Sequence, residues 1–167
     1  MGGAPPAQSL TRSFYGRKKI NMAYQNAYSA YQKNNVSTAS QGRLVVLLYE
    51  GAVKHLTAAK NLFGPENKLK PNQIEQFGIH IQKTQAIITE LQVSLDMEKG
   101  GEIAKNLMSL YLFFNEELMN ANINQDKDKV SSVLKMMSDL ADAWRTIANS
   151  TANAPATKVP NAVNIVV

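Results

Sequence analysis

Apolar residues recur every three or four positions along four stretches of the chain, the spacing that places them on one side of an α-helix. The first stretch runs from Ser40, a residue type common at helix N-caps, to Phe63, and Gly64–Pro65 then ends it. The second starts at Asn72, three residues before Glu75, in the spacing of a capping box. Its apolar positions are Ile74, Phe77, Ile81, Ile88, Leu91 and Leu95. Each stretch predicts an amphipathic helix of roughly 20 to 24 residues.

Two further helical stretches follow the Gly100–Gly101 pair, which breaks the pattern. The third helix reaches about Asn122, and its apolar positions are Ile103, Leu107, Leu110, Phe114 and Leu118. The fourth begins after the candidate N-cap Asp126, and its apolar positions are Val130, Leu134, Met137, Leu140, Ala141, Trp144 and Ile147. No stretch alternates apolar and polar residues as a strand would. Because the connections are short and the helices similar in length, the sequence predicts an all-α, antiparallel up-down four-helix bundle.

The first and third predicted helices are apolar over more of their circumference than one core-facing stripe requires. One face of the first helix carries Leu44, Leu47, Leu48, Gly51, Ala52, His55, Ala59 and Leu62, and an adjacent second face carries Val45, Val46, Tyr49, Val53 and Leu56. In the third helix, a second direction carries Met108, Leu112 and Met119. Flexible Met side chains suit a surface that adapts to a partner. Two interpretations stay open: both are inner helices covered by flanking elements, or the second faces bind a partner.

The two ends of the chain lack the helical pattern. Residues 1–21 contain early Gly and Pro and no apolar stretch typical of a secretory signal, so we expect a disordered basic extension there. Residues 150–167 are rich in Ala, Asn, Pro, Thr and Val, and we expect a disordered tail. The bundle domain is therefore expected at residues 22–149. Tyr24, Tyr28 and Tyr31 fall in a short helix or arm ahead of the first long helix.

Charge is concentrated near the N-terminal end. The chain has 18 Lys and Arg against 13 Asp and Glu, and four of the basic residues lie in the first 21 positions, which contain no acid. From Met22 onward the balance is 14 to 13, so the predicted bundle is nearly neutral and nucleic-acid binding is not expected. The longest apolar run, Leu44–Tyr49, is far shorter than the roughly 20 residues of a membrane-spanning helix. We therefore expect no insertion into a membrane.

Few residues could carry chemistry. The absence of Cys excludes a disulfide, a thiolate zinc site and a cysteine nucleophile. Neither His55 nor His80 has an acid three residues before it, as the di-iron bundles require. The adjacent Glu116 and Glu117 diverge on a helix and cannot act as an acid–base pair. We expect no enzyme activity, no metal and no cofactor. A structural role is expected for His55, with a histidine phosphotransfer bundle, or another adaptor bundle, as the alternative.

Several segments occur in the order and spacing of a known family. The two longest are Ala39–Ala52 (ASQGRLVVLLYEGA) and Leu95–Leu107 (LDMEKGGEIAKNL). The shorter ones are Ala27–Gln32, Leu110–Tyr111, Ala121–Asn122 and Ala141–Trp144. Between about Tyr24 and Ile147, the chain resembles the FliS family, the export chaperones of bacterial flagellin.

The resemblance implies a cytoplasmic bacterial chaperone without catalysis. Such proteins bind the disordered C-terminal segment of flagellin, prevent its premature polymerisation and assist its delivery to the flagellar type III export gate. The segment folds into helices against apolar grooves on the bundle, which favours a partner for the second faces. We therefore expect flagellin contacts at Tyr28, Tyr31, Val45, Tyr49, Val53, Met108 and Leu112. An anti-sigma factor stays open as a second partner.

Overall fold

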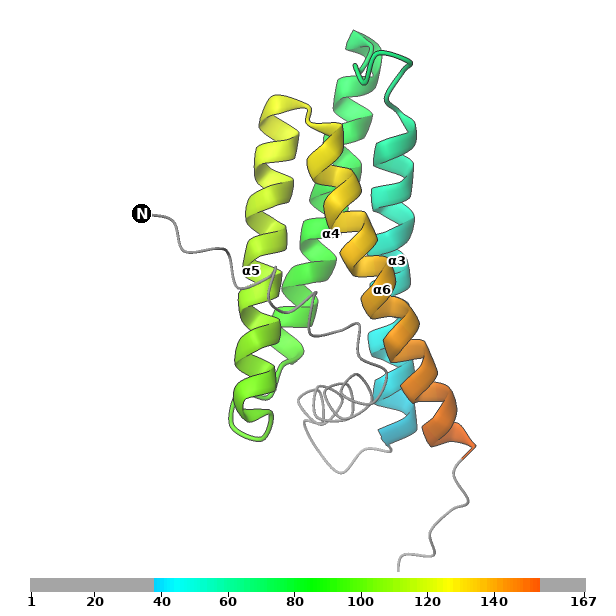
Figure 1. The fold of residues 1–167 in the computed structure, drawn as a ribbon, viewed down its shortest axis with the longest axis vertical. Coiled ribbons are helices and arrows are strands. Elements are labelled where there is room, and N and C mark those ends of the chain that lie inside the picture. Colours follow the sequence, from blue (N-terminus) through cyan, green and yellow to red (C-terminus); the bar gives the residue numbers. More distant parts are fainter. Residues whose placement is uncertain (1–37, 154–167) are drawn as a thin grey trace, which may run out of the picture.

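The computed structural model describes residues 38–153, which contain four α-helices and one short 3₁₀ helix (Figure 1). The α-helices are α3 (Thr38–Asn61), α4 (Ile74–Ser94), α5 (Gly101–Asn124) and α6 (Lys127–Ala152). The 3₁₀ helix η1 (Pro71–Gln73) leads directly into α4. No strand occurs within residues 38–153. The expected extension at 1–21 and the tyrosine arm lie outside the described residues.

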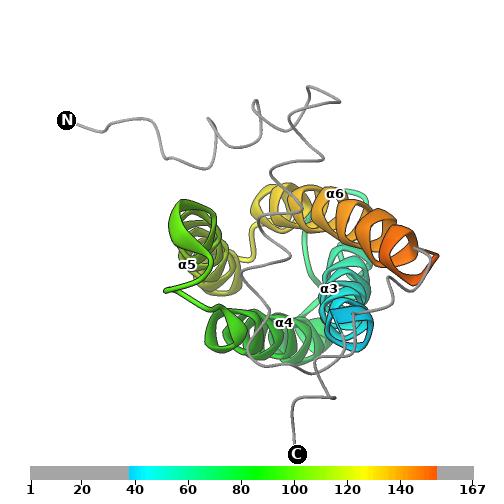
Figure 2. The same ribbon diagram turned by 90° about the horizontal axis from the view of Figure 1, so that it is seen from below.

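The four α-helices run alternately up and down and form a closed ring of neighbours. In Figure 1, α3 and α5 run in one direction and α4 and α6 in the other. Each helix packs against two others, so that α3 lies between α4 and α6 while α5 contacts α4 and α6 on the far side. The view along the bundle in Figure 2 shows α5 diagonally opposite α3. The prediction of an all-α four-helix bundle is confirmed.

Aromatic side chains from three helices meet in the core. Tyr49 of α3 stacks on Trp144 of α6 with ring centroids 6.3 Å apart, and its hydroxyl forms a hydrogen bond with the hydroxyl of Tyr111 on α5. All three side chains are fully buried. Near the end of α3, the ring of Phe63 packs edge-on against Phe77 of α4 at 5.3 Å. The contacts of Tyr49 connect α3 with helices that are far apart from it in the sequence, and the hydroxyl pair satisfies polar groups that would otherwise be costly to bury.

The first two helices begin at different residues from those predicted. α3 already includes Thr38, so Ser40 lies inside the helix and the prediction that it is the N-cap is wrong. The predicted capping box of Asn72 and Glu75 is also wrong, because Pro71 starts a 3₁₀ turn one residue earlier. At this turn the Gln73 side chain accepts a hydrogen bond from the backbone N–H of Lys70 at 3.3 Å. Proline fixes the backbone φ and favours the first position of such a turn, which explains the earlier start.

The prediction for the start of the last helix is confirmed. One carboxylate oxygen of Asp126 accepts hydrogen bonds from the backbone N–H groups of Asp128 at 2.9 Å and Lys129 at 3.1 Å. These donors belong to the first turn of α6 and have no partner inside the helix, so the cap stabilises its N-terminus. The helix continues to Ala152, and therefore includes the first residues of the segment expected to be a tail.

Candidate protein-binding surfaces

The structure places the predicted contacts on α3 at different depths. Val45 is 4% exposed and Tyr49 is fully buried, so both lie in the core, whereas Val53 is half-buried. The second face of α3, which we expected to bind a partner, is therefore directed mostly into the bundle. The outward face carries Leu44 and Leu47, which are 57% and 58% exposed. The expectation that Val45 and Tyr49 lie at a surface is wrong, and their role as partner contacts stays a prediction.

On α5 the second apolar direction does face outward. Leu112 is 57% exposed, Met119 is 51% exposed and Ile123 is 71% exposed, while Met108 is half-buried. The spacing of four, seven and four residues places these side chains along one side of the helix. We call Met108, Leu112, Met119 and Ile123 the α5 strip. Exposed apolar side chains that recur on one side of a helix are suited to contact with a partner helix.

The α5 strip lies on the flank of α5 that is nearer to α4. Gln92 of α4 donates a hydrogen bond from Nε2 to the Met108 sulfur at 3.7 Å. The other flank of α5 faces α6, where the Lys129 ammonium pairs with the Glu117 carboxylate at 2.9 Å. The charged groups of α5 that bind α6 therefore lie away from the strip.

Side-chain amides connect α4 to α5 along the edge of the strip. Gln85 donates from Nε2 to the backbone carbonyl of Asn115 at 3.3 Å, and Asn115 donates from Nδ2 to Gln92 Oε1 at 3.4 Å. Both distances are long for hydrogen bonds of this kind. The carbonyl oxygen of the Asn115 side chain is buried and accepts no hydrogen bond from the described residues. This edge of the bundle is therefore polar and incompletely paired.

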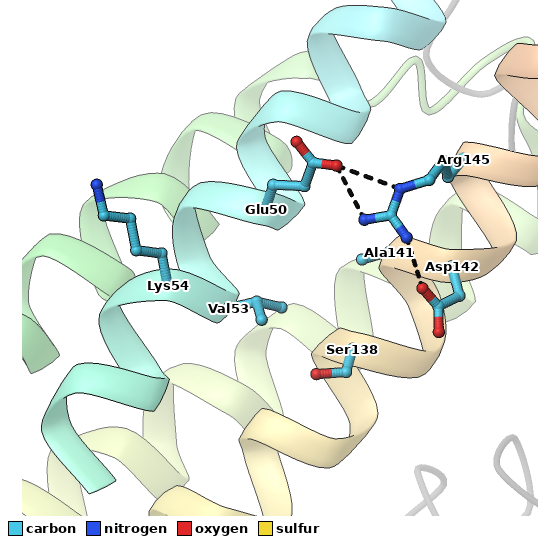
Figure 3. Close-up of a pocket in the computed structure, with 7 residues that line it drawn as sticks. All are labelled: Glu50, Val53, Lys54, Ser138, Ala141, Asp142 and Arg145. Atoms are coloured by element: carbon cyan, nitrogen blue, oxygen red, sulfur yellow. Dashed lines mark hydrogen bonds and ion pairs between the residues drawn. The ribbon is translucent and has the colours of Figure 1, made fainter. Parts of the chain in front are cut away.

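A shallow groove of about 270 Å³ lies between α3 and α6 (Figure 3). Its lining residues are Glu50, Val53, Lys54, Ser138, Ala141, Asp142 and Arg145. Val53 therefore lines a surface concavity, unlike Val45 and Tyr49. Lys54 extends away from the ion pairs at the other end of the groove. The groove combines a small apolar floor with a charged rim.

The charged rim of this groove is held by Arg145. Its Nη2 lies 2.9 Å from Glu50 Oε1, and its Nη1 lies 2.7 Å from Asp142 Oδ1. The hydrogen bond to Glu50, more than the one to Asp142, raises the already high pKa of the guanidinium. The three side chains are solvent-exposed, so these pairs orient the rim and contribute little to stability.

The two histidines form a pair that the sequence did not indicate. His55 of α3 and His80 of α4 are half-buried and lie with their Nδ1 atoms 3.1 Å apart. His80 Nε2 also lies 3.2 Å from the side-chain nitrogen Nε2 of Gln76. The two paired histidines are 25 residues apart in the sequence, so no local pattern can reveal the contact. His55 lies at the edge of the α3–α4 contact, outside the core.

Within residues 38–153, no group of three or more His, Asp or Glu side chains is placed to hold a metal ion. Among these helices, none is long and apolar enough to cross a membrane. The features that stand out are the α5 strip, the amide edge beside it and the groove between α3 and α6.

Comparison with known proteins identifies the sequences that this chain resembles. The family described as "Flagellar protein FliS" matches residues 24–151. The chain is 35% identical over 124 residues to the flagellar secretion chaperone FliS of Campylobacter jejuni, an alignment that covers 74% of this chain and 92% of the relative. It is 31% identical over 129 residues to that of Bacillus subtilis, which covers 77% of this chain and 91% of the relative. The chain is also 35% identical to the Escherichia coli protein of the same name, in an alignment that covers 66% of this chain and 77% of the relative.

Proposed function

The chain belongs to the FliS family of flagellar secretion chaperones, and from this membership we propose that it binds the C-terminal segment of flagellin in the bacterial cytoplasm. Bound in this way, the segment is prevented from polymerising before export. The chaperone then assists delivery of flagellin to the flagellar type III export gate. It acts by binding and carries out no catalysis.

The observation that best supports this function is the α5 strip. Leu112, Met119 and Ile123 are each more than half exposed, and they recur at helical spacing on one side of α5. An amphipathic helix buries the same kind of stripe, so the strip offers a disordered segment a surface on which to fold. Burial of apolar side chains provides the main favourable free energy of such binding.

Binding at the strip is tested by adding charge to it. Leu112→Glu and Met119→Glu are each expected to weaken binding of the flagellin C-terminal segment by tenfold or more, about 1.4 kcal/mol, because a carboxylate would be buried against the bound helix. Both side chains are exposed, so the variants should still fold. Isothermal titration calorimetry measures the affinity, and circular dichroism verifies the helical content.

A matched control places the same charge elsewhere on α5. Asn106 is exposed and lies off the strip, so Asn106→Glu should bind the flagellin segment as the unmodified protein does. Unchanged binding by both strip variants would place the flagellin contact elsewhere on the bundle. The groove containing Val53 would then be the next surface to test, through Val53→Glu.

A histidine phosphotransfer bundle remains the alternative function. It requires an accessible imidazole with basic neighbours, and the charges of Lys54 and Lys83 do act on His55. However, His55 is half-buried and its Nδ1 lies within hydrogen-bond distance of His80. Incubation with a phosphorylated response regulator tests this function directly. Stable incorporation of phosphate at His55 would favour phosphotransfer, whereas its absence together with flagellin binding favours the chaperone.

A further inference from the structure

Asn115 stands out because its side chain is incompletely hydrogen-bonded in a partly buried position. Its Nδ2 donates to Gln92 Oε1 at 3.4 Å, and its Oδ1 is buried without a donor among the described residues. An amide oxygen that is removed from water without a donor destabilises the fold. A leucine at this position would not carry that cost.

Reassigning the amide atoms does not remove the unpaired group. If the Asn115 amide is turned over, Nδ2 takes the buried place of Oδ1 and Oδ1 faces the carbonyl oxygen of Gln92. Turning over Gln92 as well restores a hydrogen bond between the two amides, yet it leaves Asn115 Nδ2 without an acceptor. In either orientation one polar atom of Asn115 is unsatisfied. The deficit is thus a property of the site and does not depend on which atom is oxygen.

The position of Asn115 on α5 connects this deficit with the α5 strip. It follows Leu112 by three residues and precedes Met119 by four, so it lies on the same side of the helix. Asn115 is half-buried, whereas Leu112 and Met119 are more than half exposed. It therefore places a partly buried polar group at the inner edge of the strip, toward α4.

We propose that Asn115 selects the segment that binds the α5 strip, by hydrogen-bonding a side-chain donor of the bound flagellin helix. This inference rests on the proposed function, in which a flagellin helix covers the strip. The terminal torsion of asparagine has broad energy minima, so its amide can turn from the α4 edge toward the bound helix. A donor such as an amide, hydroxyl or ammonium group would satisfy the Asn115 oxygen. An apolar residue at the same place would bury the oxygen unpaired and would bind less well.

A polar group of this kind fixes the register of a helix that apolar contacts alone hold loosely. Met108, Leu112, Met119 and Ile123 provide similar apolar contacts along the strip, so a bound helix could slide by one turn at small cost. One buried hydrogen bond distinguishes these registers, because in the wrong ones both the donor and Asn115 lose their partner. Asn115 thus contributes selectivity at a cost in stability of the free chaperone.

Substitution of Asn115 tests the proposal through two opposed readouts. Asn115→Leu should raise the melting temperature of the free protein, because it removes an unsatisfied polar group. The same variant should bind the flagellin C-terminal segment about tenfold more weakly by calorimetry. Asn115→Asp retains the acceptor oxygen and should bind more tightly than the Leu variant. If Asn115→Leu does not fold, Asn115→Ala removes the amide with a smaller change in volume and should show the same loss of affinity.

Controls separate this inference from the proposed function. Asn106→Leu adds the same side chain to an exposed position off the strip and should leave the affinity unchanged. If the unmodified protein does not bind the flagellin segment, the proposed function itself fails. If it binds, and Met119→Glu weakens binding while Asn115→Leu binds equally or more tightly, only the role of Asn115 is overturned.

Discussion

His55 and His80 face each other across the contact between α3 and α4, with their Nδ1 atoms 3.1 Å apart and their ring centroids 5.4 Å apart. A hydrogen bond at this distance needs one nitrogen with a proton and one without. Burial lowers the pKa of both imidazoles, and the charge of Lys83 lowers each of them further. Lys54 and the neighbouring His80 also lower the pKa of His55. The pair is therefore held in its neutral form near neutral pH.

We predict that the free energy of unfolding falls as the pH is lowered below 6.5. The unfolded chain has ordinary histidine pKa values of about 6.5, whereas the folded values are lower, so acid favours the unfolded state. Well above pH 6.5, where both histidines are neutral in the folded and the unfolded state, these two groups should contribute no pH dependence. Urea titrations at pH 5 and pH 7.5 measure the difference. In His80→Gln, which removes one titrating group, the loss between these pH values should be smaller.

The hydrogen bond between Tyr49 and Tyr111 should contribute about 1 kcal/mol to stability. Tyr49→Phe retains the stacked ring beside Trp144 and removes only the hydroxyl. Chemical denaturation of Tyr49→Phe, Tyr111→Phe and the double variant provides a thermodynamic cycle. We expect the free energy of unfolding of the double variant to fall by less than the sum of the decreases in the two single variants. Additive losses would show that the hydroxyl pair makes no net contribution.

Removal of the N-cap of α6 should destabilise the fold modestly. Asp126→Ala eliminates two hydrogen bonds to the first turn of the helix and is expected to cost about 1 kcal/mol. Asp126→Asn retains a hydrogen-bond acceptor at the same place and should lose less stability than Asp126→Ala. Thermal melting followed by circular dichroism compares the two variants. Equal losses would attribute the effect to the negative charge near the helix N-terminus instead of the hydrogen bonds.

Tyr28 and Tyr31 lie outside the described residues, and their contact with flagellin stays a prediction. Their three-residue spacing would place both rings on one side of a helical turn. If they contact flagellin, Tyr28→Ala combined with Tyr31→Ala should weaken binding of the C-terminal segment in calorimetry. Tighter binding would mean that the two rings only compete with flagellin for the apolar surface. Unchanged binding would mean that the two tyrosines neither contact flagellin nor compete with it.

Sequence reasoning identified the helices because their signals are local. The apolar spacing and the breaks at Gly64–Pro65 and Gly100–Gly101 located four helices, although the first two start at other residues than predicted. Asp126 was recognised as a cap because its donors lie two and three residues away. By contrast, the prediction that Ser40 is the N-cap is wrong, because a helix start depends on whether the preceding residues also adopt helical backbone angles.

The candidate site was only partly predictable because it depends on contacts between distant residues. Two adjacent faces of α3 are apolar, and periodicity cannot determine which of them faces inward. Packing of Tyr49 against Trp144, 95 residues later in the sequence, places that face in the core. On α5 the second apolar direction, which carries Leu112, does face outward, and its contact with flagellin stays a prediction. The incomplete pairing of Asn115 depends on Gln92 in another helix, and no local pattern in the sequence indicates it.

The aromatic cluster in the core also provides a spectroscopic reporter within the molecule. Trp144 is the only tryptophan of the chain, and it is fully buried against Tyr49 where α6 meets α3. Its emission should shift to longer wavelength when the bundle opens, since water then reaches the indole. Tyr49 lies close enough to transfer its excitation energy to Trp144, and separation of α3 from α6 would end that transfer. Fluorescence can therefore follow unfolding of the chaperone without any added label.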